Sequence, residues 1–215
     1  DDSGETVTGA RTFGYDTLII AVGSLSNDFG TPGVREHALK LESAADARRF
    51  HLRMFNACVR AHAQNTPLRP EQLQVAIIGA GATGVELSAE LRFTTKEVVA
   101  YGLDGGDVNR DIKVSVIEAA PRVLPALPER LSAATEKLLG KLGIDVYTNA
   151  KVAEVEPQGV RFADGRFLPA EMVVWAAGVK GPEFLTTLDG LETNRVNQLV
   201  VRQTLQTTHD DNIFA

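Results

Sequence analysis

Three glycines at the spacing Gly-x-Gly-x-x-Gly are the residues of this chain whose types and positions most directly imply chemistry. They are Gly79, Gly81 and Gly84, placed between the apolar run 75–78 and a helical pattern that begins at Thr83. In such a unit the first glycine permits a tight turn, the second lets the backbone approach a pyrophosphate, and the third lets the helix pack closely on the strand. The N–H groups at the start of the helix then bind phosphate oxygens. The pattern therefore predicts a dinucleotide site in which the three glycines and Thr83 hold the pyrophosphate.

A dinucleotide site of this kind also needs an acidic residue at the end of the next strand, where it accepts hydrogen bonds from the adenosine ribose. Glu118 ends that strand, but it lies 39 residues after Gly79, whereas about 20 is usual. The segment Tyr101–Asp111, with three glycines and three aspartates, explains the difference as an inserted loop. A carboxylate at position 118 repels a 2′-phosphate and favours NAD over NADP, although Arg122 could pair with such a phosphate.

The elements that must position these residues alternate between strand and helix. Apolar runs and helical periodicity predict strand 74–79, helix 83–100, strand 113–118, helix 127–142 and strand 144–148. Such alternation predicts a parallel sheet with crossover connections. Short half-apolar segments separated by turn residues then predict a β-meander over 152–156, 159–162 and 166–168, followed by a buried strand at 172–176. The predicted fold is α/β, a Rossmann-like parallel sheet with a three-stranded antiparallel β-meander crossover.

The first third of the chain has a simpler pattern. Tyr15–Val22 is predicted to be a buried strand, closed by Gly23, and a linker rich in glycine, proline and asparagine follows over 24–33. Apolar residues recurring every three or four positions predict a helix over Leu41–Ala63, with Ser43 able to cap it.

Composition limits the class of protein. The chain has 215 residues and a net charge of −6, and it carries no basic stripe, so nucleic acid is not an expected partner. No apolar run approaches the ~18 residues that span a bilayer. A single cysteine, Cys58, fits a reducing compartment such as the cytoplasm.

A metal site is not expected. His51, Cys58 and His62 are spaced to lie on one face of the predicted helix. A zinc site needs a fourth ligand, usually from another element, and no paired Cys or His motif supplies one, so an ordinary amphipathic helix explains the spacing.

Four segments taken together resemble the flavoprotein oxidoreductases that bind two dinucleotides, and most closely the type II NADH dehydrogenases (NADH:quinone oxidoreductases). The segments are Tyr15–Gly23, Gly79–Leu87, Val116–Pro125 and Val173–Val179. The resemblance extends from about residue 13 to the end of the chain. It implies that NADH and FAD are the cofactors of the whole protein.

The resemblance also implies a division of the chain, because in this family an NADH-binding half is inserted into a split FAD-binding half. Residues 1–36 correspond to the end of the first FAD-domain segment and a linker, 37–202 to the NADH-binding Rossmann-like domain, and 203–215 to the truncated start of the returning FAD-domain segment. The family's FAD fingerprint is expected upstream of residue 1. This chain is therefore expected to be a fragment that binds NADH weakly, holds no FAD and performs no catalysis.

Further site residues follow from the resemblance. It gives Glu86 a catalytic role, facing the nicotinamide near the flavin, while the plain alternative is a carboxylate stabilised by the helix dipole. Ala177, Gly178 and Val179 follow the last strand, where loops line the ligand crevice, and they are expected to contact the nicotinamide unless they form only a turn. Gly23 corresponds to a hinge that contacts FAD.

The expected partners are a quinone and a membrane surface, both reached through segments outside this chain, and the protein is a candidate homodimer. The expected location is cytoplasmic, with the whole protein peripheral on the cytoplasmic face of the inner membrane. Two alternatives remain open: a non-catalytic module that senses NADH, and a related flavoprotein reductase with a sulfide or ferredoxin partner.

Overall fold

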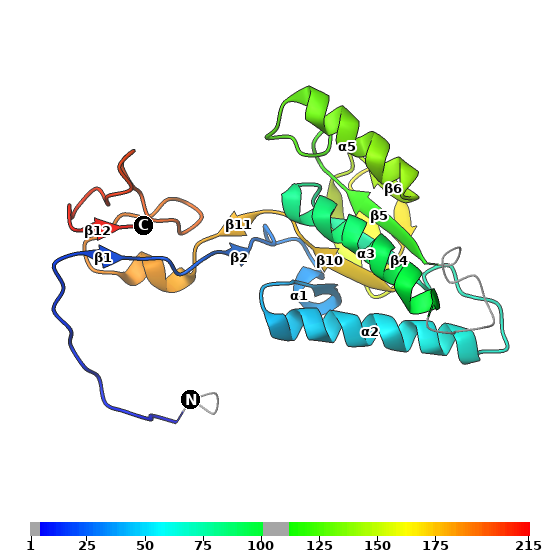
Figure 1. Cartoon of the computed structure of the whole chain (residues 1–215), viewed down its shortest axis with the longest axis horizontal. Helices are drawn as coiled ribbons and strands as arrows, with labels where there is room; N and C mark the ends of the chain where they lie inside the picture. Colours follow the sequence, from blue (N-terminus) through cyan, green and yellow to red (C-terminus); the bar gives the residue numbers. More distant parts are fainter. Residues whose placement is uncertain (1–4, 101–111) are drawn as a thin grey trace. The chain divides into compact units, whose positions relative to one another are not determined.

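The computed structural model describes residues 5–100 and 112–215 and shows two compact units in the chain. One unit comprises residues 1–25 and 180–215, and the other comprises residues 26–179 (Figure 1). We call them the split unit and the central unit. The inserted loop predicted at Tyr101–Asp111 lies outside the described residues.

A five-stranded sheet forms the centre of the central unit, in the order β3-β10-β4-β5-β6. All of its pairings are parallel. Its strands are β3 (Ala38–Leu39), β10 (Met172–Trp175), β4 (Gln74–Ile78), β5 (Lys113–Ile117) and β6 (Ile144–Tyr147). The predicted parallel sheet is confirmed, and the short edge strand β3 is an addition that the sequence pattern did not predict.

The three inner strands of this sheet, β10, β4 and β5, are buried on both faces, because alternate side chains enter two separate cores. On β4, Val75 and Ile77 belong to one core, while Ala76 and Ile78 belong to the other. Successive side chains of a strand point to opposite faces of the sheet. A strand that is covered on both faces is therefore expected to be apolar throughout. The continuous apolar runs in the sequence follow from this burial.

Three helices contribute to the first core. They are α2 (Ala44–Ala63), α3 (Ala82–Ala100) and α5 (Glu129–Lys141), which supply Phe50, Leu91 and Leu139 respectively. Ser43 caps α2 as predicted, since its side chain accepts a hydrogen bond from the N–H of Asp46, although the helix begins at Ala44 and not at the predicted Leu41.

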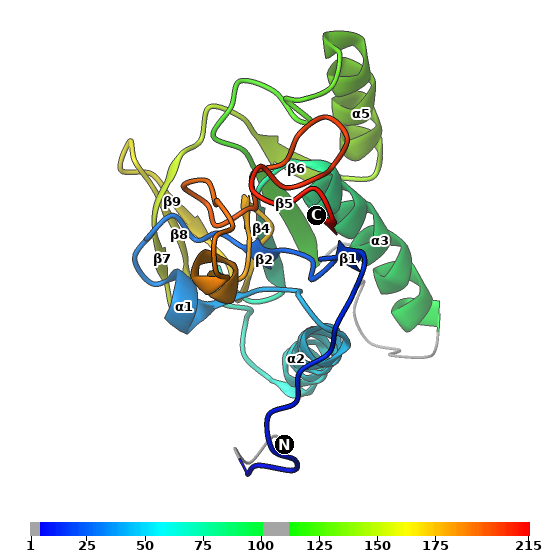
Figure 2. The same ribbon diagram turned by 90° about the vertical axis from the view of Figure 1, so that its left-hand side faces the viewer.

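A three-stranded antiparallel meander covers the other face of the sheet, on the side away from α3 (Figure 2). Its strands are β7 (Val152–Glu156), β8 (Gly159–Phe162) and β9 (Phe167–Pro169). The meander connects β6 to β10 in place of the helix usual in such folds, which confirms the predicted crossover. A short helix, α1 (Val34–His37), also packs here through Val34.

The split unit has little regular structure. It contains β1 (Leu18–Ile19) paired in parallel with β12 (Ile213–Phe214), and a 3₁₀ helix at Glu183–Thr187. The chain passes between the units at β2 (Leu25–Ser26) and β11 (Val179–Lys180), which pair with each other.

The prediction of a buried strand over Tyr15–Val22 is wrong for this structure. Only two of its residues form a strand, and Ile19 is 71% exposed. The apolar run indicates a strand that is covered on both faces, but the two-stranded sheet of the split unit supplies no such cover.

The units also differ in extent from the predicted domains. The central unit spans residues 26–179, whereas the sequence placed the inserted domain at 37–202. Residues 180–202 therefore group with the split unit. No helix among the described residues is sufficiently long and apolar to cross a lipid bilayer.

Candidate functional site

A cavity of about 560 Å³ lies within the central unit, where β10, β4 and β5 end. Strands β6, β5, β4 and β10 run in the order 3-2-1-4 relative to their order in the chain. The direction of the strand order therefore reverses between β4 and β10, and such a switch point is where open α/β sheets bind their ligands. The volume is in the range of small-molecule and cofactor sites.

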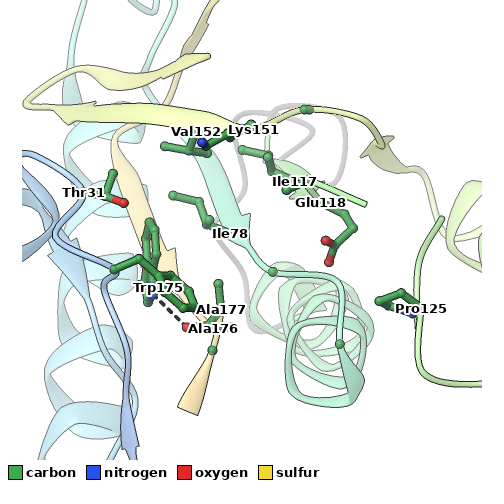
Figure 3. Close-up of a pocket in the computed structure, with 16 residues that line it drawn as sticks. Thr31, Ile78, Ile117, Glu118, Pro125, Lys151, Val152, Trp175, Ala176 and Ala177 are labelled. Carbon is green, nitrogen blue, oxygen red and sulfur yellow. Dashed lines mark hydrogen bonds between the residues drawn. The ribbon is translucent and has the colours of Figure 1, made fainter. Parts of the chain in front are cut away.

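The residues that line this cavity come mainly from the loops after the strands (Figure 3). They are Phe29, Thr31, Ile78, Gly79, Gly81, Ile117, Glu118, Ala119, Pro125, Ala150, Lys151, Val152, Trp175, Ala176, Ala177 and Gly178.

The three glycines behave as their spacing predicts. Gly79 has φ +105°, and a Cβ there would lie 2.8 Å from the backbone of Ala176. A Cβ on Gly84 would overlap the carbonyl oxygen of Gly79, so the third glycine lets α3 approach the turn. Gly81 lines the cavity and has nothing within 4 Å of where a Cβ would stand. Open space at Gly81 is what close approach of a ligand to the backbone requires.

Glu118 lies at the end of β5 with its carboxylate towards the glycine loop (Figure 3). One oxygen accepts a hydrogen bond from the N–H of Ala80, and the other accepts one from the N–H of Ala120, both at 2.9 Å. A carboxylate has about four lone-pair positions, so these two bonds leave capacity for ribose hydroxyls. The structure thus gives Glu118 a second task, which is to hold the glycine loop.

Arg122 is held by hydrogen bonds to its own loop and to the first turn of α5. Its guanidinium donates to the carbonyl oxygens of Leu127 at 2.7 Å and Pro125 at 2.8 Å, and to the hydroxyl of Ser132 at 2.5 Å. These bonds orient the guanidinium toward backbone acceptors. They count against the alternative in which Arg122 pairs with a 2′-phosphate.

The end of β10 forms the opposite side of the cavity from Glu118 (Figure 3). Ala177 and Gly178 line the cavity, whereas Val179 is exposed and does not. The Trp175 indole is buried in the core, as its apolar strand predicts, and its N–H donates to the carbonyls of Asn27 and Ala177, both at 2.9 Å. Trp175 therefore fixes the loops on both sides of it.

Two predicted residues on α3 lie outside the cavity lining. Thr83 and Glu86 are exposed and do not line the cavity. Thr83 is nevertheless in the first turn of α3, where the N–H groups have no partner within the helix.

Other lining residues were missed by sequence reasoning. Lys151 follows β6 closely, and the rule that ligand crevices form at the carboxyl ends of strands would have suggested it. Phe29 and Thr31 come from the predicted linker, where only the Asn-Asp-Phe-Gly turn composition gave a signal.

The linker residues are held by a buried carboxylate. One oxygen of Asp28 accepts from the N–H of Gly30 at 3.1 Å, and the other lies 3.2 Å from Lys40 Nζ and 3.3 Å from Arg35 Nε. The hydrogen bond from Gly30 and the two cations lower the pKa of Asp28 to about 2. Asp28 is therefore ionised, and it ties the loop to the start of the central unit.

The cysteine is a core residue of α2. Cys58 is buried, and burial, with Glu171 adding to it, raises the pKa of its thiol. His51 and His62 are exposed. Within residues 5–100 and 112–215, no three metal-ligating side chains gather at one point.

Gly23 belongs to the split unit and has φ +73°. It lines a cavity of about 180 Å³ together with Ile20–Ser24, Gly181, Leu185, Gln198, Leu199 and Ala215. This cavity is about a third of the size of the one in the central unit.

Comparison with known proteins supports one assignment. The family model described as pyridine nucleotide-disulphide oxidoreductase matches residues 2–215. A type II NADH:quinone oxidoreductase from Haemophilus influenzae is 40% identical over 225 residues, covering 99% of this chain and 50% of that protein. A probable mitochondrial NADH-ubiquinone oxidoreductase from Schizosaccharomyces pombe is 34% identical, covering 81% of this chain and 33% of that protein.

A solved structure has the same fold. The NDH2 of Plasmodium falciparum, in a complex with NADH, superposes with a TM-score of 0.77 at 27% identity, covering 94% of this chain and 43% of that one. The chain thus spans half or less of the length of these relatives. Because the family model covers almost every residue, this chain belongs to the pyridine nucleotide-disulphide oxidoreductase family.

Proposed function

We propose that this chain is the NADH-binding part of an FAD-dependent NADH:quinone oxidoreductase. The observation that carries the proposal is the cavity at the switch point of the parallel sheet, with open space over Gly81 and a carboxylate at the end of the next strand. The relatives named as NADH:quinone oxidoreductases support the choice of dinucleotide and of acceptor.

Different residues of the cavity are proposed to bind different parts of the dinucleotide. Glu118 accepts hydrogen bonds from the adenosine ribose, and its charge disfavours a 2′-phosphate. The backbone at Gly81 and the first N–H groups of α3, including that of Thr83, hold the pyrophosphate. Ala177 and Gly178 lie at the nicotinamide side, because β10 and β5 flank β4 on opposite sides.

When bound, NADH would supply a hydride for a flavin held by the FAD half of the whole protein, with a quinone as the proposed electron acceptor. The residues of this chain bind and orient the nicotinamide. Glu86 is proposed to act beside the nicotinamide, where it orients the carboxamide or assists proton movement.

The proposal is tested by titrating the chain with NADH and with NADPH in a calorimeter. Saturable binding of NADH with weaker binding of NADPH is expected. Equal or reversed affinity would remove Glu118 from its assigned role, and an absence of NADH binding would reject the proposed site.

The redox step needs the whole protein. With the full-length protein and a soluble quinone, loss of the near-ultraviolet absorbance of NADH should depend on quinone, and Glu86→Gln should lower kcat more than it changes KM. An unchanged kcat would leave Glu86 with the plain role of a carboxylate at a helix start.

Peripheral membrane association at the cytoplasmic face and a homodimeric state are proposed for the whole protein by its resemblance to the family. Flotation of the full-length protein with vesicles of bacterial lipid, and its mass by light scattering, test these two statements separately.

A further inference from the structure

The loop Asn27–Thr31 is fastened to the end of β10. The N–H of Asn27 donates to the carbonyl of Gly178 at 3.3 Å, and the Trp175 indole donates to the carbonyl of Asn27 at 2.9 Å. Just beyond the loop, the carbonyl of Pro32 accepts from the N–H of Val155 on the meander at 3.0 Å. The loop is therefore anchored at both of its ends within the central unit.

The middle of the loop is fixed from inside. The N–H of Phe29 donates to the side-chain oxygen of Asn27 at 3.0 Å, and that of Gly30 donates to Asp28 at 3.1 Å. These bonds hold Phe29 at φ +51°, a left-handed conformation that is rare for a bulky residue. A strained backbone that its surroundings over-determine is found most often at ligand sites.

This strained backbone places the Phe29 ring directly against Gly178. A Cβ on Gly178 would overlap the ring, so the glycine at this position leaves room for the phenyl group. The ring is 65% exposed and also lines the cavity. The ring therefore packs against Gly178 while most of its surface stays open to a ligand.

We propose that the Phe29 ring is a fixed wall against which the nicotinamide end of the dinucleotide packs. This inference rests on the proposed function. With the ribose at the end of β5 and the pyrophosphate at the end of β4, the nicotinamide half lies on the β10 side, where Phe29 and Gly178 are found. The planar ring of the nicotinamide offers an apolar face to a phenyl group.

The anchored backbone fixes the Cα of Phe29, and its ring lies against Gly178, so Phe29 is proposed to be a wall rather than a gate. A gate must leave its place when the ligand enters, and removing it would strengthen binding. A wall contributes contact, and removing it weakens binding only for ligands that carry the nicotinamide. Phe29 is thus a positioning residue for the nicotinamide, beyond the contacts of Ala177 and Gly178.

The test compares NADH with ADP-ribose, which has the same adenosine and pyrophosphate but no nicotinamide. Calorimetric titration of the 215-residue chain should show tighter binding of NADH than of ADP-ribose. Phe29→Ala should weaken NADH binding about two- to tenfold, the worth of one aromatic contact, and leave ADP-ribose binding unchanged. The NADH affinity of Phe29→Leu, which keeps most of the side-chain bulk, should lie between those of the unmodified chain and Phe29→Ala.

Phe93→Ala is the matched control, because Phe93 is an exposed aromatic of the central unit on α3, outside the cavity lining. It should change neither affinity. An unchanged or tightened NADH affinity in Phe29→Ala, or equal weakening for both ligands, overturns the role of Phe29. If the unmodified chain bound neither ADP-ribose nor NADH, the proposed function would be rejected instead.

Discussion

At the scale of single residues, Glu118 holds the glycine loop and is also proposed to bind the ligand. Its oxygens accept from the N–H groups of Ala80 and Ala120, and the same carboxylate is available to the ribose. The order of the strands brings the end of β5 beside the glycine turn, so an acid at this position meets both.

Replacing Glu118 with Gln should therefore have two effects. Only one oxygen remains to accept, so one backbone N–H loses its partner, and the free energy of unfolding should fall by about 1 kcal/mol. With the charge removed, the preference for NADH over NADPH should shrink. Thermal unfolding and titration of both nucleotides measure these effects. Glu90→Gln, an exposed change on α3, is the control. It should change neither the free energy of unfolding nor the preference for NADH over NADPH.

Residue types and spacing predicted that the glycines and Glu118 lie together at the strand ends, because the proposed roles demand particular amino acids. They did not identify Phe29. Its proposed role depends on a left-handed backbone, which the flanking side chains of Asn27 and Asp28 help to hold, and on a glycine about 150 residues away that no local pattern reveals.

At the scale of elements, the Asn27–Thr31 loop depends on the ionised state of Asp28. The pKa of this carboxyl is about 2 in the folded chain against an ordinary value of 3.8. The lowered pKa means that Asp28 contributes stability above the ordinary pKa, and that this contribution is lost as pH falls through 3.8 toward 2.

Asp28→Asn should accordingly destabilise the chain by roughly 1–2 kcal/mol near neutral pH, a value reduced for the exposure of Arg35. The difference from the unmodified chain should shrink as pH falls below about 4. Urea unfolding at a series of pH values checks this. Asp145→Asn, at an exposed position of β6, serves as the control. A difference that stays constant down to pH 2 would show that the ion pairs of Asp28 carry no stability.

The elements of the central unit were largely predictable, since the inner strands β10, β4 and β5 are covered on both faces and helices α2, α3 and α5 each contribute to the core. The meander was predictable from its turn residues. Tyr15–Val22 was not, because an apolar run specifies a strand only where other elements cover it, and those described in the split unit do not.

At the scale of the whole molecule, the cavities found in the two units differ in size. The cavity in the central unit is about 560 Å³ and the one at Gly23 is about 180 Å³. We therefore expect the purified chain to contain no flavin, and to give no absorbance in the blue. Stoichiometric FAD in the purified chain would show that the split unit holds the cofactor by itself.

The central claim is that the cavity at the ends of β10, β4 and β5 binds NADH through the backbone at Gly81. Gly81→Ala tests it most directly, since a Cβ there meets no protein atom within 4 Å and intrudes only on the ligand. The control is Gly140→Ala in α5, where a Cβ also meets nothing within 4 Å. In calorimetric titration with NADH, the unmodified chain and Gly140→Ala should bind alike, and Gly81→Ala should bind about tenfold more weakly, as overpacking by one methyl group implies. Equal affinity in all three proteins would contradict the account.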